Sequence, residues 1–254
     1  MMRVRWAAIA VLLATRGAAF TEDKQPEAPR VIAVAPFGVI SGEQATLRIR
    51  GAKLSNATEL RFDDAPAGLS AEIKEKKAAE IPTGLDAQAV GDTQIEVKLN
   101  VPADLHVRSV NFRVVTPDGT TAPRELRVLN ATDCVEEIEP NGGLREAQPL
   151  ALGQTLRGTI KEDKDVDTFR ILGKAGQRLT ADIVAAQGAS FLDSLLTLYD
   201  GQGHPLASND DHTLRDSHLV FQLPADGAYL LTVQDAHDRG SLWHTYLLSI
   251  TEAP

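Results

Sequence analysis

The sequence predicts an all-β chain that folds into two β-sandwich domains. Three observations support this class: short segments in which apolar and polar residues alternate, turn residues between those segments, and no convincing amphipathic helix in the second half. Alternation with a period of two turns one face of a strand to a core and the other to water. Several such strands separated by turn signals are typical of a sandwich.

The first predicted domain spans residues 30–130 and follows a polar linker at 20–29. Its alternating segments are 46–50, 60–62, 95–99, 110–114 and 126–128. Turn residues separate the segments, at 41–42, 63–66 and 117–119. The stretch 71–80 is rich in Lys, Glu and Ala and departs from the pattern, so we expect a helical turn or an exposed hairpin there.

The second predicted domain spans residues 133–252 and repeats the same pattern. Its alternating segments are 156–160, 169–171, 179–183, 219–223, 229–233 and 246–250. Glycine-containing turns are expected at 200–203 and 225–227. The boundary between the domains falls near 130–136, where the alternation lapses and acidic residues take over.

Residues 1–19 read as a secretory signal peptide. Arg3 and Arg5 precede an apolar run at 6–14 that is too short to cross a bilayer, and small residues follow at 17–19. We therefore expect a secreted, periplasmic or cell-surface protein with no membrane span. The single cysteine, Cys134, allows no intramolecular disulfide and is expected to be a small half-buried side chain.

The formal net charge is -9, with a pI of about 5.2. This argues against a nucleic-acid partner, which requires a basic face. An extracellular protein or polysaccharide is the expected kind of partner.

Two acidic stretches flank the start of the second domain, at 136–141 and 163–169. Carboxylates close together repel one another unless a positive charge lies among them, and nothing basic is interleaved in the first stretch. A hard cation with oxygen ligands, calcium above all, is the simplest reason for the pattern. The alternative is an acidic hinge exposed to solvent.

Several short motifs of the second half occur in the order typical of one bacterial family. They are residues 137–141, 147–150, 158–160, 165–169, 175–177, 198–203, 206–211 and 226–229. With these motifs, residues 133–252 resemble the bacterial pre-peptidase C-terminal domain. The resemblance implies a jelly-roll-like sandwich found in secreted multi-modular proteins, often beside proteases, and similar to collagen-binding modules in which calcium sits between the segment leading into the sandwich and the sandwich itself.

The resemblance also implies a set of calcium ligands. The lead-in ligands would be Glu137, Glu139 and Asn141, and the sandwich ligands would be Asp165 and Asp167. Where the family often has an acid after the Asn, this chain has Gly142, so one ligand is missing and a lower affinity is expected.

The first half resembles an IPT/TIG immunoglobulin-like domain. The residues that carry this resemblance are Pro29, Val31, Val34, Pro36, Gly38, Gly42, 46–51, Leu54 and 57–62. Such domains act as spacers or protein-contact modules, so the resemblance implies an immunoglobulin-like sandwich ahead of the jelly-roll-like one.

A second acid-rich set offers oxygen ligands further along the second domain. Its members are Asp193, Asp200, Asn209, Asp210 and Asp211. They suit a second calcium site, but Asp and Asn near Gly are also ordinary turn residues.

Three classes of function are compatible with the sequence. The leading one is a secreted, non-catalytic binding or accessory module. The second is the N-terminal portion of a larger secreted protease or other exoenzyme, whose catalytic domain is absent from this chain. The third, a free-standing hydrolase, is disfavoured: His204, His212 and His218 lie close in sequence, but neither a Gly-x-Ser-x-Gly nor a His-Glu-x-x-His motif accompanies them.

The signal peptide gives the first testable prediction. Secreted material should begin at or near Phe20, after cleavage at or near Ala19, because small residues there follow the apolar run. Intact mass spectrometry of the exported protein measures this directly. A mature chain that begins at Met1 would contradict it.

Overall fold

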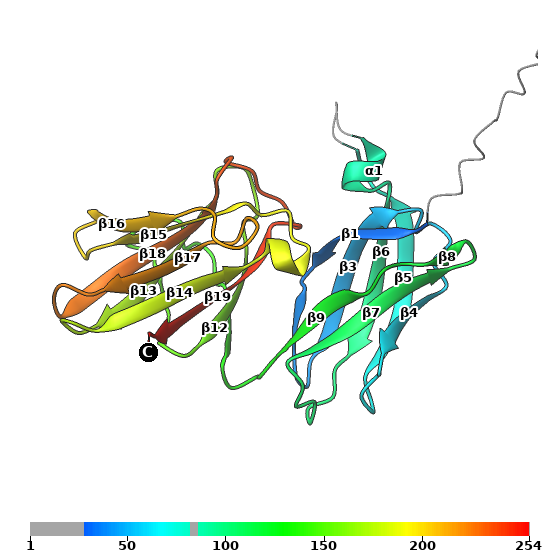
Figure 1. The fold of residues 1–254 in the computed structure, drawn as a ribbon, viewed down its shortest axis with the longest axis horizontal. Coiled ribbons are helices and arrows are strands. Elements are labelled where there is room, and N and C mark those ends of the chain that lie inside the picture. Colours follow the sequence, from blue (N-terminus) through cyan, green and yellow to red (C-terminus); the bar gives the residue numbers. More distant parts are fainter. Residues whose placement is uncertain (1–27, 82–85, 254) are drawn as a thin grey trace, which may run out of the picture.

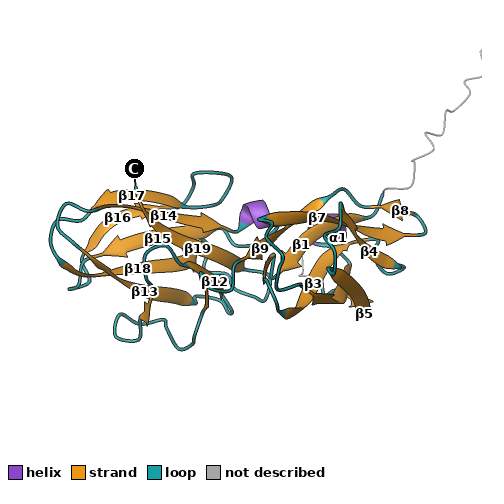
Figure 2. Ribbon diagram, turned by 90° about the horizontal axis from the view of Figure 1, so that it is seen from below, coloured by secondary structure: helices purple, strands orange, loops and turns teal. Residues whose placement is uncertain are grey.

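A computed structural model describes residues 28–81 and 86–253 of the chain (Figure 1). These residues form two β-sandwiches that lie end to end, as Figure 2 shows. The all-β class predicted from the sequence is confirmed. The expected signal peptide at 1–19 and residues 20–27 of the expected linker lie outside the described residues.

The first sandwich consists of two sheets, in which most strands pair antiparallel, and one short helix. Its elements are β1 (Arg30–Ala35), β2 (Gly38–Ile40), β3 (Gln44–Ala52), β4 (Glu59–Asp63), β5 (Ser70–Ala78), α1 (Ala87–Val90), β6 (Thr93–Asn100), β7 (Ser109–Thr116), β8 (Gly119–Thr120) and β9 (Arg124–Leu129). One sheet has the order β1-β3-β6-β5, and the other has the order β2-β9-β7-β4, with β8 paired to β7.

The alternation of the sequence reappears as cross-strand pairs in this sandwich. On β3, Leu47 pairs with Val97 of β6, and Ile49 pairs with Ile95. All four side chains are completely buried. The polar residues between them face solvent, because successive side chains of a strand point to opposite faces.

The charged stretch 71–80 forms most of β5, an edge strand antiparallel to β6. The stretch is neither the expected helical turn nor a hairpin of its own, but a single exposed edge strand whose partner β6 follows after α1. Its lysines and glutamates lie exposed along the sheet edge, where charged side chains discourage pairing with another chain. The strand forms in spite of its composition because β6 supplies the hydrogen-bonding partner.

The second sandwich has two five-stranded sheets. Its elements are β10 (Cys134–Glu136), β11 (Gln148–Pro149), β12 (Thr155–Thr159), β13 (Val166–Gly173), β14 (Arg178–Val184), the 3-10 helix η1 (Ala186–Gly188), β15 (Ser194–Tyr199), β16 (Pro205–Asn209), β17 (His218–Gln222), β18 (Gly227–Asp235) and β19 (Thr245–Glu252). The sheet orders are β10-β12-β19-β14-β17 and β11-β13-β18-β15-β16.

The core of the second sandwich takes inward-facing residues from both sheets. Leu156, Phe169, Ile171 and Leu248 are fully buried within it. Strand β15 lies outside the alternating segments predicted from the sequence, although its Leu196 and Leu198 face the core. Cys134 is half-buried as expected, and burial raises the pKa of its thiol to about 11.

None of the helices in the described part of the chain has the length and hydrophobicity needed to cross a bilayer.

Two leucines, one buried on β15 and one exposed on β13, give a prediction about stability with its own control. Leu196→Ala should destabilise the protein by about 2–5 kcal/mol, because Leu196 is 0% exposed and its removal leaves a cavity. Leu172→Ala, on β13, should change stability by no more than about 0.5 kcal/mol, because Leu172 is 74% exposed. Denaturant unfolding of the two variants measures both changes in the free energy of unfolding. Equal losses of stability would contradict the conclusion that Leu196 of β15 faces the core.

Candidate metal centre

The segment that leads into the second sandwich, residues 134–141, begins at the edge of one of its sheets. Its first part is β10, which pairs in parallel with β12. Beyond β10, the Gln148 carboxamide accepts a hydrogen bond from the backbone N–H of Ile138 at 2.8 Å and donates one to the Glu136 carbonyl at 2.8 Å. This fixes the backbone on both sides of Glu137.

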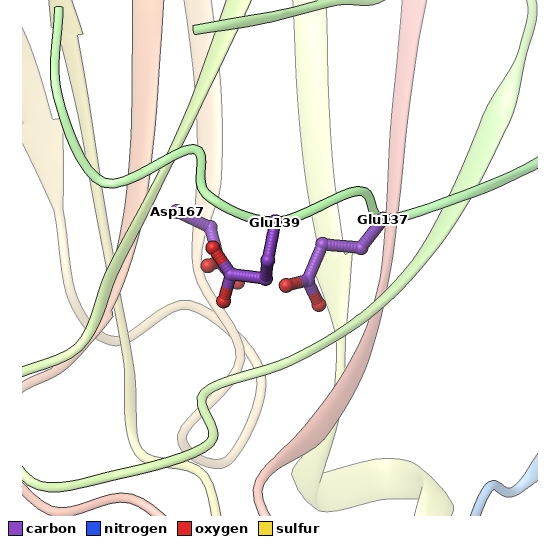
Figure 3. Close-up of side chains that lie close together, drawn as sticks. All are labelled: Glu137, Glu139 and Asp167. Carbon is purple, nitrogen blue, oxygen red and sulfur yellow. The ribbon is translucent and has the colours of Figure 1, made fainter. Parts of the chain in front are cut away.

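Alternation along this lead-in segment aims two carboxylates at the sandwich. Ile138 is 67% exposed, whereas the side chains of its neighbours Glu137 and Glu139 are only 4% and 33% exposed. The carboxylate of Asp167, on β13, lies beside them. One oxygen from each of the three side chains lies within 4.8 Å of the others (Figure 3).

Lys161 supplies a positive charge to this cluster. Its ammonium donates to Glu137 Oε1 at 2.9 Å and to Glu139 Oε1 at 3.2 Å. This ion pair could not be read from the sequence, because Lys161 stands more than twenty residues after the glutamates and reaches them only through the pairing of β10 with β12. One ammonium thus serves two of the three carboxylates.

Asp167 is buried completely in an acidic environment. Burial raises the pKa of its carboxyl group to about 8, and the charges of Glu137, Asp165 and Glu139 act in the same direction. A hydrogen bond donated by the Tyr246 hydroxyl to Asp167 Oδ2 opposes the shift. The other oxygen, Asp167 Oδ1, has no hydrogen-bond partner.

The two glutamates differ in their protonation preference. Burial raises the pKa of Glu137, in spite of hydrogen bonds from Lys161 and from the backbone of Thr159. Burial opposes ionisation of Glu139 as well, but hydrogen bonds from the Asn141 backbone and from Lys161 outweigh it and lower the pKa. The cluster therefore holds charge most readily at Glu139.

Asn141 is the second buried group whose polar atoms lack partners. Its side chain is 0% exposed, and neither its oxygen nor its nitrogen makes a hydrogen bond. Its backbone N–H donates to Glu139 Oε2 at 3.0 Å, and its carbonyl accepts from Thr168 at 3.1 Å. Leaving a buried polar group unpaired costs about 1–3 kcal/mol, so a missing partner at this position calls for a physical reason.

The five predicted ligands therefore fall into three situations. Glu137, Glu139 and Asp167 form one group. Asn141 is linked to this group through its backbone, which hydrogen-bonds to Glu139 and to Thr168, the residue after Asp167. Asp165 lies outside the group of three, and its Oδ2 accepts the backbone N–H of Lys161 at 2.7 Å.

Gly142 stands where the resemblance leads one to expect an acid. A Cβ atom at this position would lie 3.2 Å from the carbonyl oxygen of Val166, which is closer than most Cβ contacts. A larger residue would therefore press on the start of β13, just before Asp167.

The second acid-rich set is dispersed into turns. Asp200 accepts backbone N–H groups of Gln202 and His204, and Asp210 accepts that of Asp211. Asn209 accepts the backbone N–H of His218. Within residues 28–81 and 86–253, the group around Glu137 is the only set of three or more His, Cys, Asp or Glu side chains spaced to hold an ion.

The three histidines do not assemble with a serine. His204 pairs with Asp200 at 2.9 Å, and His218 pairs with Asp182 and stacks on His212. The nearby Ser208 hydroxyl bonds to Thr197 instead. These contacts fit the interpretation of His204, His212 and His218 as surface histidines.

Comparison with known proteins gives the family of the second domain. Residues 165–235 match the model of the family described as "Bacterial pre-peptidase C-terminal domain". The chain contains a pre-peptidase C-terminal domain. The match begins at Asp165, so it includes Asp167 and lies beyond the lead-in segment.

A probable subtilase-type serine protease from Deinococcus radiodurans is 42% identical to this chain over 126 residues. The aligned region is 47% of this chain and only 17% of that protease. Among solved structures, the pre-peptidase C-terminal domain of a collagenase from Bacillus anthracis matches 45% of this chain and 100% of its own, at 15% identity and a TM-score of 0.36. A periplasmic inhibitor of g-type lysozyme from Aeromonas hydrophila matches 41% of this chain and 97% of its own, at 21% identity and a TM-score of 0.30.

The raised pKa of Asp167 predicts how the metal-free protein responds to pH. The folded state holds a proton up to a pKa of about 8, whereas the unfolded chain releases it near the ordinary value of 3.8. The stabilising contribution of this proton is therefore complete below about pH 4 and is lost as the pH rises through 8, with a slope of at most about 1.4 kcal/mol per pH unit.

Thermal melts in calcium-free buffer between pH 5 and pH 8.5 measure this effect. The melting temperature of the wild type should fall over the interval, and Asp167→Asn should flatten the fall. Asp118→Asn is the control, since Asp118 is exposed in a turn of the first sandwich. A slope that is unchanged in Asp167→Asn would contradict the assignment.

Proposed function

We propose that this chain is a secreted, non-catalytic accessory module whose second sandwich is stabilised by calcium. The observation that carries the calcium assignment is the pair of buried side chains with unpartnered oxygens, Asp167 and Asn141, next to Glu137 and Glu139. A cation would give these oxygens the partner that the protein itself does not supply.

The chemistry of the donors favours calcium among cations. All five proposed ligands, Glu137, Glu139, Asn141, Asp165 and Asp167, offer oxygen atoms, and calcium takes about six to eight of these in flexible geometry. Neither sulfur nor imidazole takes part, which disfavours zinc and copper. Asp165 would join the ligands by releasing the Lys161 backbone.

An acidic cluster compensated by Lys161 alone is the competing interpretation. It is supported by the two contacts from Lys161 to the glutamates. In that case Asp167 stays protonated at neutral pH, and the Asn141 carboxamide stays unpaired. Because the Lys161 side chain is 51% exposed, a bound cation could displace its ammonium into water at little cost.

The accessory role rests on the kind of domain and on the relative that carries it. The pre-peptidase C-terminal domain is a non-catalytic domain, and the aligned region occupies a small part of a protease in the relative. The alternative proposal is therefore that this chain is a portion of a larger secreted protease or other exoenzyme, with its catalytic domain elsewhere. In either case, an extracellular protein or polysaccharide is the proposed partner.

The contact most like a catalytic dyad in the described residues is local. Ser241 Oγ lies 2.8 Å from His244 Nδ1, but the same hydroxyl accepts the backbone N–H of Trp243 at 3.1 Å. The Asp235 carboxylate, whose charge acts on His244, accepts backbone N–H groups of Asp193, His237 and Arg239. The arrangement closes a turn, which supports the non-catalytic proposal.

Calcium should raise the melting temperature of the protein. Extracellular calcium modules bind with Kd of about 10⁻⁴–10⁻³ M, and the glycine at position 142 argues for the weak end. A tenfold excess over Kd contributes about 1.4 kcal/mol, which corresponds to a rise of roughly 3–6 °C for a chain of this size. Magnesium should do less, because it demands a tighter octahedron.

Variants locate the response at the cluster. Glu137→Gln combined with Glu139→Gln should abolish the rise, and so should Asp165→Asn combined with Asp167→Asn. Glu59→Gln, which removes an exposed carboxylate of the first sandwich, is the matched control and should respond as the wild type does. If the wild type melts identically in calcium and in chelator, the cluster compensated by Lys161 is the correct interpretation.

A further inference from the structure

The two sandwiches share buried apolar side chains. Leu247 belongs to β19 of the second sandwich, yet it packs in the apolar core of the first and is 5% exposed. Trp243, also 5% exposed, packs against Ala33 and Ala35 of β1 together with Phe191. These contacts join residues of the two sandwiches that lie far apart in the sequence.

A close approach at Gly188 extends this interface. A Cβ atom on Gly188 would lie 2.3 Å from the ring of Phe37, so only glycine fits there without a shift. Phe37 itself is 1% exposed in the core of the first sandwich. Beside this contact, the backbone N–H of Val34 donates to the carbonyl of Ala189 at 3.1 Å.

The loop that carries Gly188 is itself held in place. It contains η1, which lies between the two sandwiches (Figure 2). The buried Asp216 carboxylate accepts the backbone N–H groups of Ala185, Ala186 and Gln187. Hydrogen bonds to a charged acceptor are strong, so the loop presents Gly188 to the first sandwich as a fixed surface.

Arg157 forms a polar clamp at another part of the interface. From β12 its guanidinium donates to Glu43 Oε1 and Oε2 of the first sandwich at 2.9 and 3.1 Å, and to the Gly38 carbonyl at 2.8 Å. It also pairs with Glu136. Burial opposes the charge of Arg157, but the hydrogen bonds that its guanidinium donates to Glu43 and Glu136 outweigh this and raise the pKa of Arg157.

We propose that the two sandwiches unfold as one cooperative unit and that the junction between β9 and β10 is a rigid joint. Relative motion is the usual expectation for neighbouring domains, unless their interface is extensive and apolar. Here apolar burial, a backbone hydrogen bond and a bidentate ion pair act at separate points of one interface. The joint needs no calcium, and the module behaves as a rigid spacer.

Trp243 is a reporter built into this interface. The sequence holds two tryptophans, Trp6 and Trp243, so Trp6→Phe leaves Trp243 alone in the full chain. Denaturant unfolding should show a single transition with the same midpoint by Trp243 fluorescence and by far-ultraviolet circular dichroism, in calcium and in chelator. A shift of Trp243 emission before the loss of β-structure, or two dichroism steps, would overturn the proposal.

The contact between Gly188 and Phe37 can be tested by a double-mutant cycle. Gly188→Ala should separate the two midpoints, with Trp243 becoming exposed first, because the added methyl group displaces the Phe37 ring. In a Phe37→Ala background the same change should have much less effect, since the obstructing ring is gone. Equal effects in both backgrounds would show that this contact does not join the sandwiches.

The Arg157 clamp allows a second, independent test of the rigid joint. Glu43→Gln should move the Trp243 transition to lower denaturant and should not add to the effect of Arg157→Gln. Glu96→Gln is the matched control, because Glu96 pairs with Arg48 inside the first sandwich and both side chains are partly exposed. Equal shifts from Glu43→Gln and Glu96→Gln would contradict a clamp between the sandwiches. The two proposals can fail separately. If the wild type shows no calcium response but still unfolds in a single transition, the proposed calcium-stabilised function is refuted and the rigid joint stands.

Discussion

The hydrogen bond from Tyr246 to Asp167 joins the core of the second sandwich to its acidic cluster. Tyr246 lies in β19 and Asp167 in β13, which belong to opposite sheets. The ring lies over Gly158, where a Cβ atom would approach it to 2.4 Å. A large aromatic side chain therefore places a donor at the buried end of a carboxylate, and this makes the burial of Asp167 tolerable.

That buried carboxylate creates the electrostatic problem that the lead-in segment addresses. Asp167 loses hydration, keeps one unpaired oxygen, and has two glutamates as neighbours. Lys161 compensates the glutamates, and Asp167 itself either holds a proton or requires a cation. Because β10, Gln148 and Asn141 fix the lead-in backbone, the same arrangement that gathers the acids also anchors the start of the domain.

The lead-in segment lies between this cluster and the joint with the first sandwich. Successive residues of an extended chain point in opposite directions. Glu136 therefore turns to Arg157, whereas Glu137 turns to Lys161 and Asp167. Charged groups thus organise both sides of one short segment, and the apolar contacts of Trp243, Leu247 and Phe37 complete the joint.

The sequence by itself determined the all-β class, because alternation such as that of Leu47 with Ile49 reports local burial. It also supplied the identity of the pre-peptidase C-terminal domain and the acidic residues of the candidate site, since these are written as short motifs. It left 71–80 open between a helical turn and an exposed hairpin, because an edge strand is decided by its partner β6 and not by its own composition. Only the tertiary structure placed Lys161 in the cluster, left Asn141 and Asp167 unpaired, separated Asp165 from them, and put Gly188 against Phe37. Each of these depends on residues brought together from distant positions by strand pairing and sandwich packing, which no local pattern encodes.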